Sequence, residues 1–129
     1  MSYSTVALEF HSAFSDFIIE LYEQFPGEID LLKAQVYVST AITPEELIST
    51  FIQHILPHKA NIKDRDDKFF LEKIGNMFSS SIGKVNHFRN IWRSSTLDDE
   101  DREILWQWFD SFVLLAEKYG ELKSTPSKN

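Results

Sequence analysis

Apolar side chains recur every three or four positions along most of the chain, which is the period of an amphipathic α-helix. The first such stretch covers residues 5–25, and Pro26-Gly27 is expected to end it, because proline disfavours helical geometry in the residue before it. A second helix is expected to begin near Glu28. Its apolar positions are Ile29, Leu32 and Val36.

The clearest helix start lies at Thr43-Pro44-Glu45-Glu46, where Thr43 can cap the helix, Pro44 suits its first position and Glu46 completes a capping box. This third helix is expected to end around Pro57, and a polar loop should follow over 58–64. Acidic side chains then favour the start of a fourth helix at Asp66 and Asp67. A fifth helix is expected over 84–93.

The last predicted helix runs from about Leu97 to Tyr119 and is expected to close at Gly120. Its apolar positions cover an arc of about 200°, against roughly 100° for an ordinary surface helix. Two explanations follow: the helix lies at the centre of a bundle, or one flank is an interface with a partner or a second copy. The candidate contact residues on this helix are Trp106, Phe109 and Val113.

These elements predict an all-α fold, a compact single-domain bundle of about six helices over residues 1–120 with a polar C-terminal tail at 121–129. A chain of 129 residues with 43% hydrophobic positions can bury a core of its own. The chain has no cysteine, which excludes disulfides and thiolate chemistry. We expect an intracellular, cytoplasmic protein outside the membrane, since neither a signal-peptide pattern nor an apolar run of about 20 residues is present.

Charge is unevenly distributed around a net value of −7. Residues 1–58 hold eight acids and one base, residues 59–93 hold four acids and eight bases, and residues 94–129 hold eight acids and four bases. The bases of the middle can neutralise neighbouring acidic helices or form a docking surface for an acidic partner. Lys84, Arg89 and Arg93 are its candidate binding residues. The net charge argues against a general affinity for nucleic acid.

Motifs that carry chemistry each fail at a particular residue. His54 and His58 have zinc spacing, but Pro57 interrupts the helix that would present them on one face. A calcium loop starting at Asp64 would need glycine where Phe69 stands. A phosphate loop ending at Lys84 lacks its first glycine and its metal-binding hydroxyl. We therefore predict no catalytic residue, no metal ligand and no cofactor.

Several aromatic strings resemble those of short all-helical proteins of unassigned function from large nucleocytoplasmic DNA viruses of algae and amoebae. The strings are Phe25-Pro26-Gly27, Asp67-Lys68-Phe69-Phe70-Leu71, Trp92, and Leu105-Trp106-Gln107-Trp108-Phe109 followed by Phe112 and Leu115. The resemblance covers about residues 10–119, and Trp108 stands where that pattern usually has tyrosine. It implies a viral origin, with a location in the host cell or the virion, and transfers no catalytic residue.

The leading hypothesis is a non-enzymatic helical protein–protein interaction or accessory protein. It would act on a protein partner, or as a homo-oligomer, through the last helix or through the basic face of 84–93. One alternative is a nucleic-acid-contacting protein that uses that basic face with its neighbouring aromatics. The other is an enzyme whose site assembles only in three dimensions.

Overall fold

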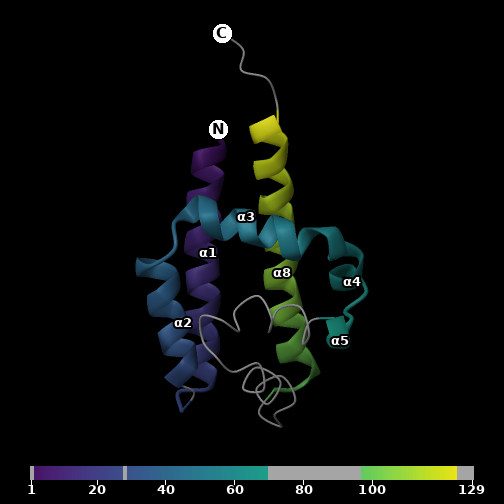
Figure 1. Cartoon of the computed structure of the whole chain (residues 1–129). Coiled ribbons are helices and arrows are strands. Elements are labelled where there is room, and N and C mark those ends of the chain that lie inside the picture. The colour runs from purple at the N-terminus through teal and green to yellow at the C-terminus, as the bar shows by residue number, and fades with distance from the viewer. Residues whose placement is uncertain (1, 28, 70–96, 125–129) are drawn as a thin grey trace.

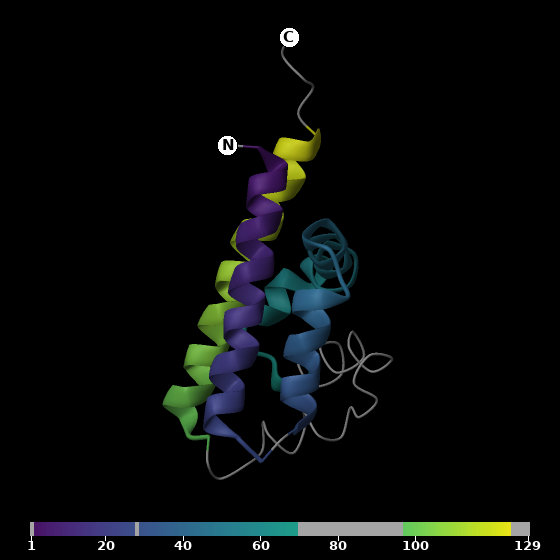
Figure 2. The same cartoon turned by 90° about the vertical axis from the view of Figure 1, so that its left-hand side faces the viewer.

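The computed structural model describes residues 2–27, 29–69 and 97–124. All regular secondary structure within these ranges is helical, which confirms the all-α class. Two long helices, α1 (Tyr3–Gln24) and α8 (Asp99–Ser124), lie side by side and run in opposite directions (Figures 1 and 2). They form the axis of the bundle, and the shorter helices pack around them.

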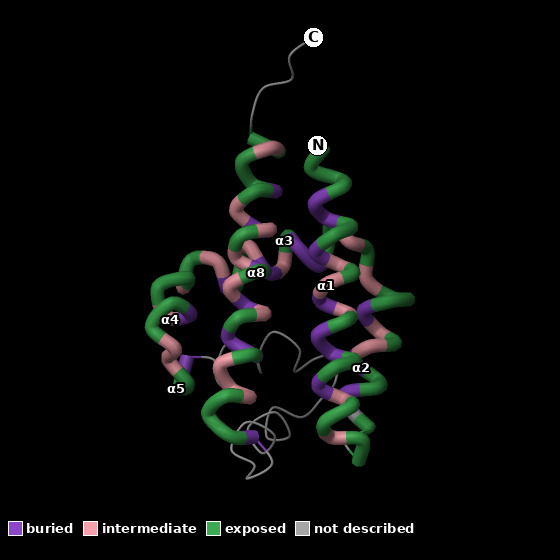
Figure 3. Tube along the Cα trace, turned by 180° about the vertical axis from the view of Figure 1, so that it is seen from behind, coloured by how far each residue is buried: buried purple, intermediate pink, exposed green. Residues whose placement is uncertain are grey.

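The shorter helices follow one another around this pair. α2 (Ile29–Thr40) runs back along α1, and α3 (Pro44–His54) then crosses both long helices (Figure 1). The chain continues through η1 (Leu56–His58), α4 (Lys59–Lys63) and α5 (Asp67–Phe69), which lie on the other side of α8 from α2 (Figure 3). Helix α8 is therefore covered from two sides, by α1 and by the α3–α4 segment.

Local chemistry at the helix ends matches the sequence prediction in two places. Thr43 Oγ1 accepts from the Glu46 amide at 3.1 Å, and Glu46 Oε1 accepts from the Thr43 amide at 3.2 Å, so the capping box of α3 is confirmed. Helix α1 ends at Gln24, directly before the turn at Pro26 and Gly27. Both signals are encoded within a few residues and need no tertiary contact.

The core is built from aromatic rings that α1, α3 and α8 direct toward one another. Phe112 lies at its centre and is fully buried. Its ring centroid lies 5.0 to 6.1 Å from those of Phe10, Phe14, Phe17, Phe51, Trp108 and Phe109. Such edge-on and offset ring pairs add to the free energy gained by burying the side chains. These contacts fix the relative position of the two long helices.

Helix α2 packs through a different face from the predicted one. Ile29, Leu32 and Val36 are between 42% and 52% exposed, whereas Leu31, Ala34 and Val38 are buried. The helix has two apolar faces, so periodicity alone could not decide which one meets α1. The small side chain of Ala34 suits the inner face, where Val38 O also lies 2.6 Å from His11 Nε2 on α1.

Two boundaries also differ from the prediction. The segment expected as a loop over 58–64 contains the end of η1 and the whole of α4, so the described residues are helical where a loop was expected. Helix α8 does not stop at Gly120 but continues to Ser124, so the start of the predicted tail is helical. Gly120 keeps a helical backbone there. The predicted helix over 84–93 lies outside the described residues.

Candidate functional site

An apolar hollow lies between α4 and α8. It has a volume of about 400 Å³ and is open to solvent. Apolar side chains line most of it, with two lysines and one aspartate beside them: Ala60, Ile62, Val113, Leu114, Lys59, Lys63 and Asp110. Leu114 is 67% exposed, which makes it the most exposed large apolar side chain in the described part of the chain. Helix α8 thus presents a largely solvent-exposed leucine next to the apolar side chains that line the hollow.

A second hollow of about 460 Å³ follows on the same side of α8, against the end of α3 and η1. Its lining consists of Ile52, Leu56, Ala116, Glu117, Gly120 and Glu121. Positions 113, 117 and 120 are four and three residues apart, which places them on one stripe of the helix. We refer to the two hollows together as the α8 groove.

An ion pair lies between the two hollows. Lys59 Nζ on α4 donates to Glu117 Oε2 on α8 at 2.7 Å. Both side chains are well exposed, at 59% and 40%, so solvent screens their attraction and the pair contributes roughly 0 to 1 kcal/mol. Lys59 lines the first hollow and Glu117 lines the second, so the ion pair separates the two hollows of the α8 groove.

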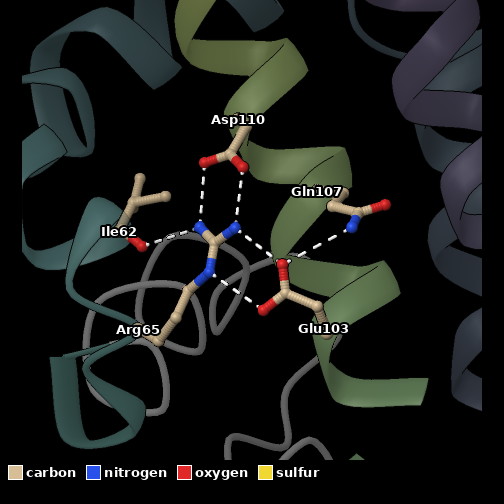
Figure 4. Close-up of polar contacts among 5 residues, drawn as sticks. All are labelled: Ile62, Arg65, Glu103, Gln107 and Asp110. Atoms are coloured by element: carbon tan, nitrogen blue, oxygen red, sulfur yellow. Dashed lines mark hydrogen bonds and ion pairs between the residues drawn. The ribbon is translucent and has the colours of Figure 1, made fainter. Parts of the chain in front are cut away.

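Arg65 connects α4 to α8 and so holds one wall of the groove (Figure 4). Its Nη1 and Nη2 donate to Asp110 Oδ1 and Oδ2 at 2.9 and 2.8 Å. Its Nε and Nη2 donate to Glu103 Oε1 and Oε2 at 3.2 and 2.8 Å, and Nη1 also donates to Ile62 O at 3.0 Å. Every N–H of the guanidinium therefore has an acceptor. We call Arg65, Glu103 and Asp110 the Arg65 cluster.

The backbone of Arg65 is left-handed, with a φ of 57°. It follows the C-cap of α4, and the hydrogen bonds there form a Schellman motif: the Arg65 amide donates to Ile62 O at 3.0 Å, and the Asp66 amide donates to Asn61 O at 2.9 Å. Glycine is the usual residue at this position, because other side chains pay a steric cost there. The contacts of the guanidinium offset that cost.

Two carboxyl groups near this corner have lowered pKa values. Hydrogen bonds from the Arg65 side chain hold the pKa of Glu103 below its ordinary value. Hydrogen bonds from the Asn61 side chain and from the Phe69 amide lower the pKa of Asp66, whose carboxylate caps the start of α5. In both cases the hydrogen bonds stabilise the ionised form. These carboxylates serve to fix the corner between α4, α5 and α8.

The structure separates the sequence-predicted candidates. Trp106 and Phe109 are buried in the core, and the Arg65 guanidinium lies 5.8 Å from the centre of the Trp106 ring. Val113 is half-buried and lines the α8 groove. Lys84, Arg89 and Arg93 lie outside the described residues. One candidate of the last helix is therefore placed at the groove, and two are placed inside the bundle.

Sequence reasoning missed Leu114, Gly120 and Arg65. A signal existed for Leu114, which falls outside the apolar arc of α8 and whose neighbours three and four positions away along the helix are polar. Gly120 looked like a helix stop because glycine is common there. Arg65 gave no signal, since only the tertiary structure brings α4 beside Glu103 and Asp110.

Within the described ranges, no group of three or more histidine, aspartate or glutamate side chains is arranged to hold a metal ion. None of the helices described is both long enough and apolar enough to span a membrane. Comparison with known proteins adds no relative: the chain matches no family model, no curated protein and no solved structure.

Proposed function

We propose that the protein is a non-enzymatic helical interaction or accessory protein that contacts a partner protein through the α8 groove. The observation that carries the proposal is Leu114, an apolar side chain that is 67% exposed and lines the first, mostly apolar hollow. Grouped exposed apolar surface is typical of contact sites, whereas single exposed apolar residues are common on any protein. The resemblance of the aromatic strings favours a viral accessory protein that acts in the host cell or the virion.

The groove is set on a scaffold that suits recognition. Helix α8 is anchored on one side by the aromatic core around Phe112, and α4 is tied to it by the Arg65 cluster. A preformed surface loses little conformational entropy when a partner binds, so more of the contact energy appears as affinity. These features support a binding role and call for no chemical step.

The test is a capture experiment on the full chain with a matched control. Leu114→Ser removes the apolar side chain from the groove, while Leu8→Ser removes a similarly exposed leucine, 60% exposed, from α1. Both changes are expected to alter the free energy of unfolding by less than about 0.5 kcal/mol, as is usual for surface positions. Wild type and both variants are tagged and used to capture proteins from the native source, with quantitative identification.

We expect at least one protein to be captured by wild type and by Leu8→Ser and to be lost with Leu114→Ser. Captured proteins that do not depend on position 114 give no support. An unchanged set with Leu114→Ser, or an equal loss with both variants, would contradict the proposal. Sedimentation of wild type over a range of concentrations shows in the same series whether a second copy of the chain is the partner.

A further inference from the structure

We infer that α4, together with the turn at Arg65 that ends it, opens from the bundle separately from the rest of the fold, and that ionic contacts control this opening. The inference goes beyond the proposed function, because it holds whether or not a partner occupies the α8 groove. It depends on three observations: ion pairs join both ends of α4 to α8, little apolar surface joins the two helices in between, and the backbone of the turn is left-handed.

Charged contacts hold both ends of α4. Lys59, the first residue of the helix, donates to Glu117 Oε2 at 2.7 Å. Arg65, which follows the C-cap of the helix, donates to both Glu103 and Asp110. All of these side chains are at least 30% exposed, so dissolved salt screens their attraction. The attachment of α4 to α8 should therefore weaken as the ionic strength rises.

Apolar packing between the two ends of α4 is slight. Ile62 is the one buried residue of this helix. Beside it lies the first hollow of the groove, which is open to solvent and has Val113 and Leu114 of α8 on its other side. The long helices are instead joined by the aromatic rings around Phe112. Segments with few buried apolar contacts open at a lower free energy than the core, so α4 should open while the aromatic core stays intact.

The turn at Arg65 links the ion pairs to the backbone. Its φ of 57° is unfavourable for any residue with a Cβ, and the contacts of the guanidinium offset this cost in the closed state. Once those contacts are lost, the turn loses its support, so we expect the ion pairs and the turn to break together. The opening uncovers Ile62 and removes the guanidinium from its place 5.8 Å from the Trp106 ring centre. It thereby adds apolar surface to the first hollow.

Thiol labelling tests this opening, because the chain has no cysteine and a single introduced thiol reports on one position. Ile62→Cys places the thiol under α4, and Val38→Cys places it on the inner face of α2 as the control, since both native side chains are buried. The full chain is treated with iodoacetamide, a neutral reagent, in about 0.1 M and about 1 M sodium chloride. The thiol at position 62 should react faster than the one at position 38. Its rate should rise about three- to tenfold with salt, while the rate at position 38 should not rise.

A charge-removing variant tests the ion pairs directly. Asp110→Asn, added to Ile62→Cys, removes the charge of one acceptor of Arg65. It should raise the labelling rate at the lower salt concentration by about three- to tenfold and reduce the further effect of salt. Asp16→Asn is the matched control, because Asp16 is an exposed residue of α1 that forms no ion pair with the described residues.

Hydrogen exchange on the unmodified chain provides a second measurement that needs no introduced thiol. The amides of Asp64 and Arg65 donate to Ala60 O and Ile62 O at 2.9 and 3.0 Å in the closed state. We expect both amides to exchange about three- to tenfold faster in about 1 M salt, with no such change for amides in the middle of α1.

Three results would overturn the inference. Equal labelling rates at positions 62 and 38, with the same dependence on urea, would show that α4 opens only when the whole fold unfolds. Labelling at position 62 that ignores salt, or that Asp110→Asn and Asp16→Asn change equally, would show that the ion pairs do not control the opening. If Ile62→Cys does not fold, exchange at Asp64 and Arg65 decides alone, and no change with salt counts against the inference. None of these results depends on capture through Leu114, so this inference and the proposed function fail separately.

Discussion

Arg65 and Asp110 form a bidentate ion pair in which Nη1 and Nη2 donate to the two carboxylate oxygens at 2.9 and 2.8 Å. Asp110 and the second acceptor, Glu103, are seven residues apart on α8, so they lie on one face about two turns apart. The guanidinium fits between them (Figure 4). This contact ties α4, one wall of the α8 groove, to the helix that forms the other.

Two substitutions at Arg65 should distinguish the contribution of its ion pairs to stability from the steric cost of its left-handed backbone. Arg65→Ala removes the hydrogen bonds and leaves a Cβ in the left-handed conformation, so we expect a loss of about 1 to 2 kcal/mol in the free energy of unfolding. Arg65→Gly removes the same hydrogen bonds but relieves the steric cost, and should be less harmful by about 1 kcal/mol. Urea unfolding followed by circular dichroism measures both. The account of the corner is wrong if the glycine variant is the less stable one.

The Arg65 cluster also predicts a loss of stability in acid. The pKa of Glu103 is lower in the folded protein than its ordinary value of 4.5, because its carboxylate accepts hydrogen bonds from Arg65. A carboxyl of this kind stabilises the folded state above the unfolded pKa, and this contribution is lost as the pH falls through the folded pKa. Arg65 stays charged throughout. The free energy of unfolding should therefore decrease as the pH falls below about 4.5.

Glu103→Gln should reduce this acid effect, because glutamine does not titrate. The measurement is a pair of urea titrations near pH 7 and near pH 3.5 for wild type and variant. The variant should be less stable than wild type at the higher pH and closer to it at the lower one. Identical pH dependence in the two proteins would show that Glu103 does not contribute in this way.

Features encoded within one turn of helix, such as the Thr43 capping box, could be predicted. The choice between the two apolar faces of α2 could not, because both have helical periodicity and only packing against α1 selects Ala34 and Val38. Arg65 could not be paired in advance, since its carboxylate acceptors lie 38 and 45 positions further along the chain. Leu114 could have been noticed as an apolar residue outside the arc of α8.

Tyr119 carries a buried hydroxyl without a hydrogen-bond partner in the described structure. Its ring packs edge-on against Tyr3 at 5.7 Å, and Lys123 Nζ lies 5.5 Å from the ring centre. Tyr119→Phe keeps the ring and removes the unpaired group, so we expect the stability to be unchanged or higher by up to about 1 kcal/mol. A loss above about 1 kcal/mol in a urea melt would mean that the hydroxyl is bonded in solution.

Gly120→Ala should separate stability from binding. The added methyl group meets nothing within 4 Å, so the substitution should stabilise α8 by about 0.5 to 1 kcal/mol. The same methyl group adds a side chain to the lining of the second hollow, where we expect it to weaken the capture that depends on Leu114. Thermal unfolding and the capture experiment together measure the two effects. A destabilised variant, or full capture by a stabilised one, would contradict this role for Gly120.

The most direct test of the α8 groove as the contact surface is site-specific photo-crosslinking in the native source. A photoreactive aromatic side chain is placed at position 114 in one variant and at position 8 in another, since both native leucines are strongly exposed, at 67% and 60%. If the α8 groove is the contact surface, we expect a discrete adduct with another protein from position 114 and little or none from position 8. Adducts of equal yield from both positions, or from position 8 alone, would contradict it.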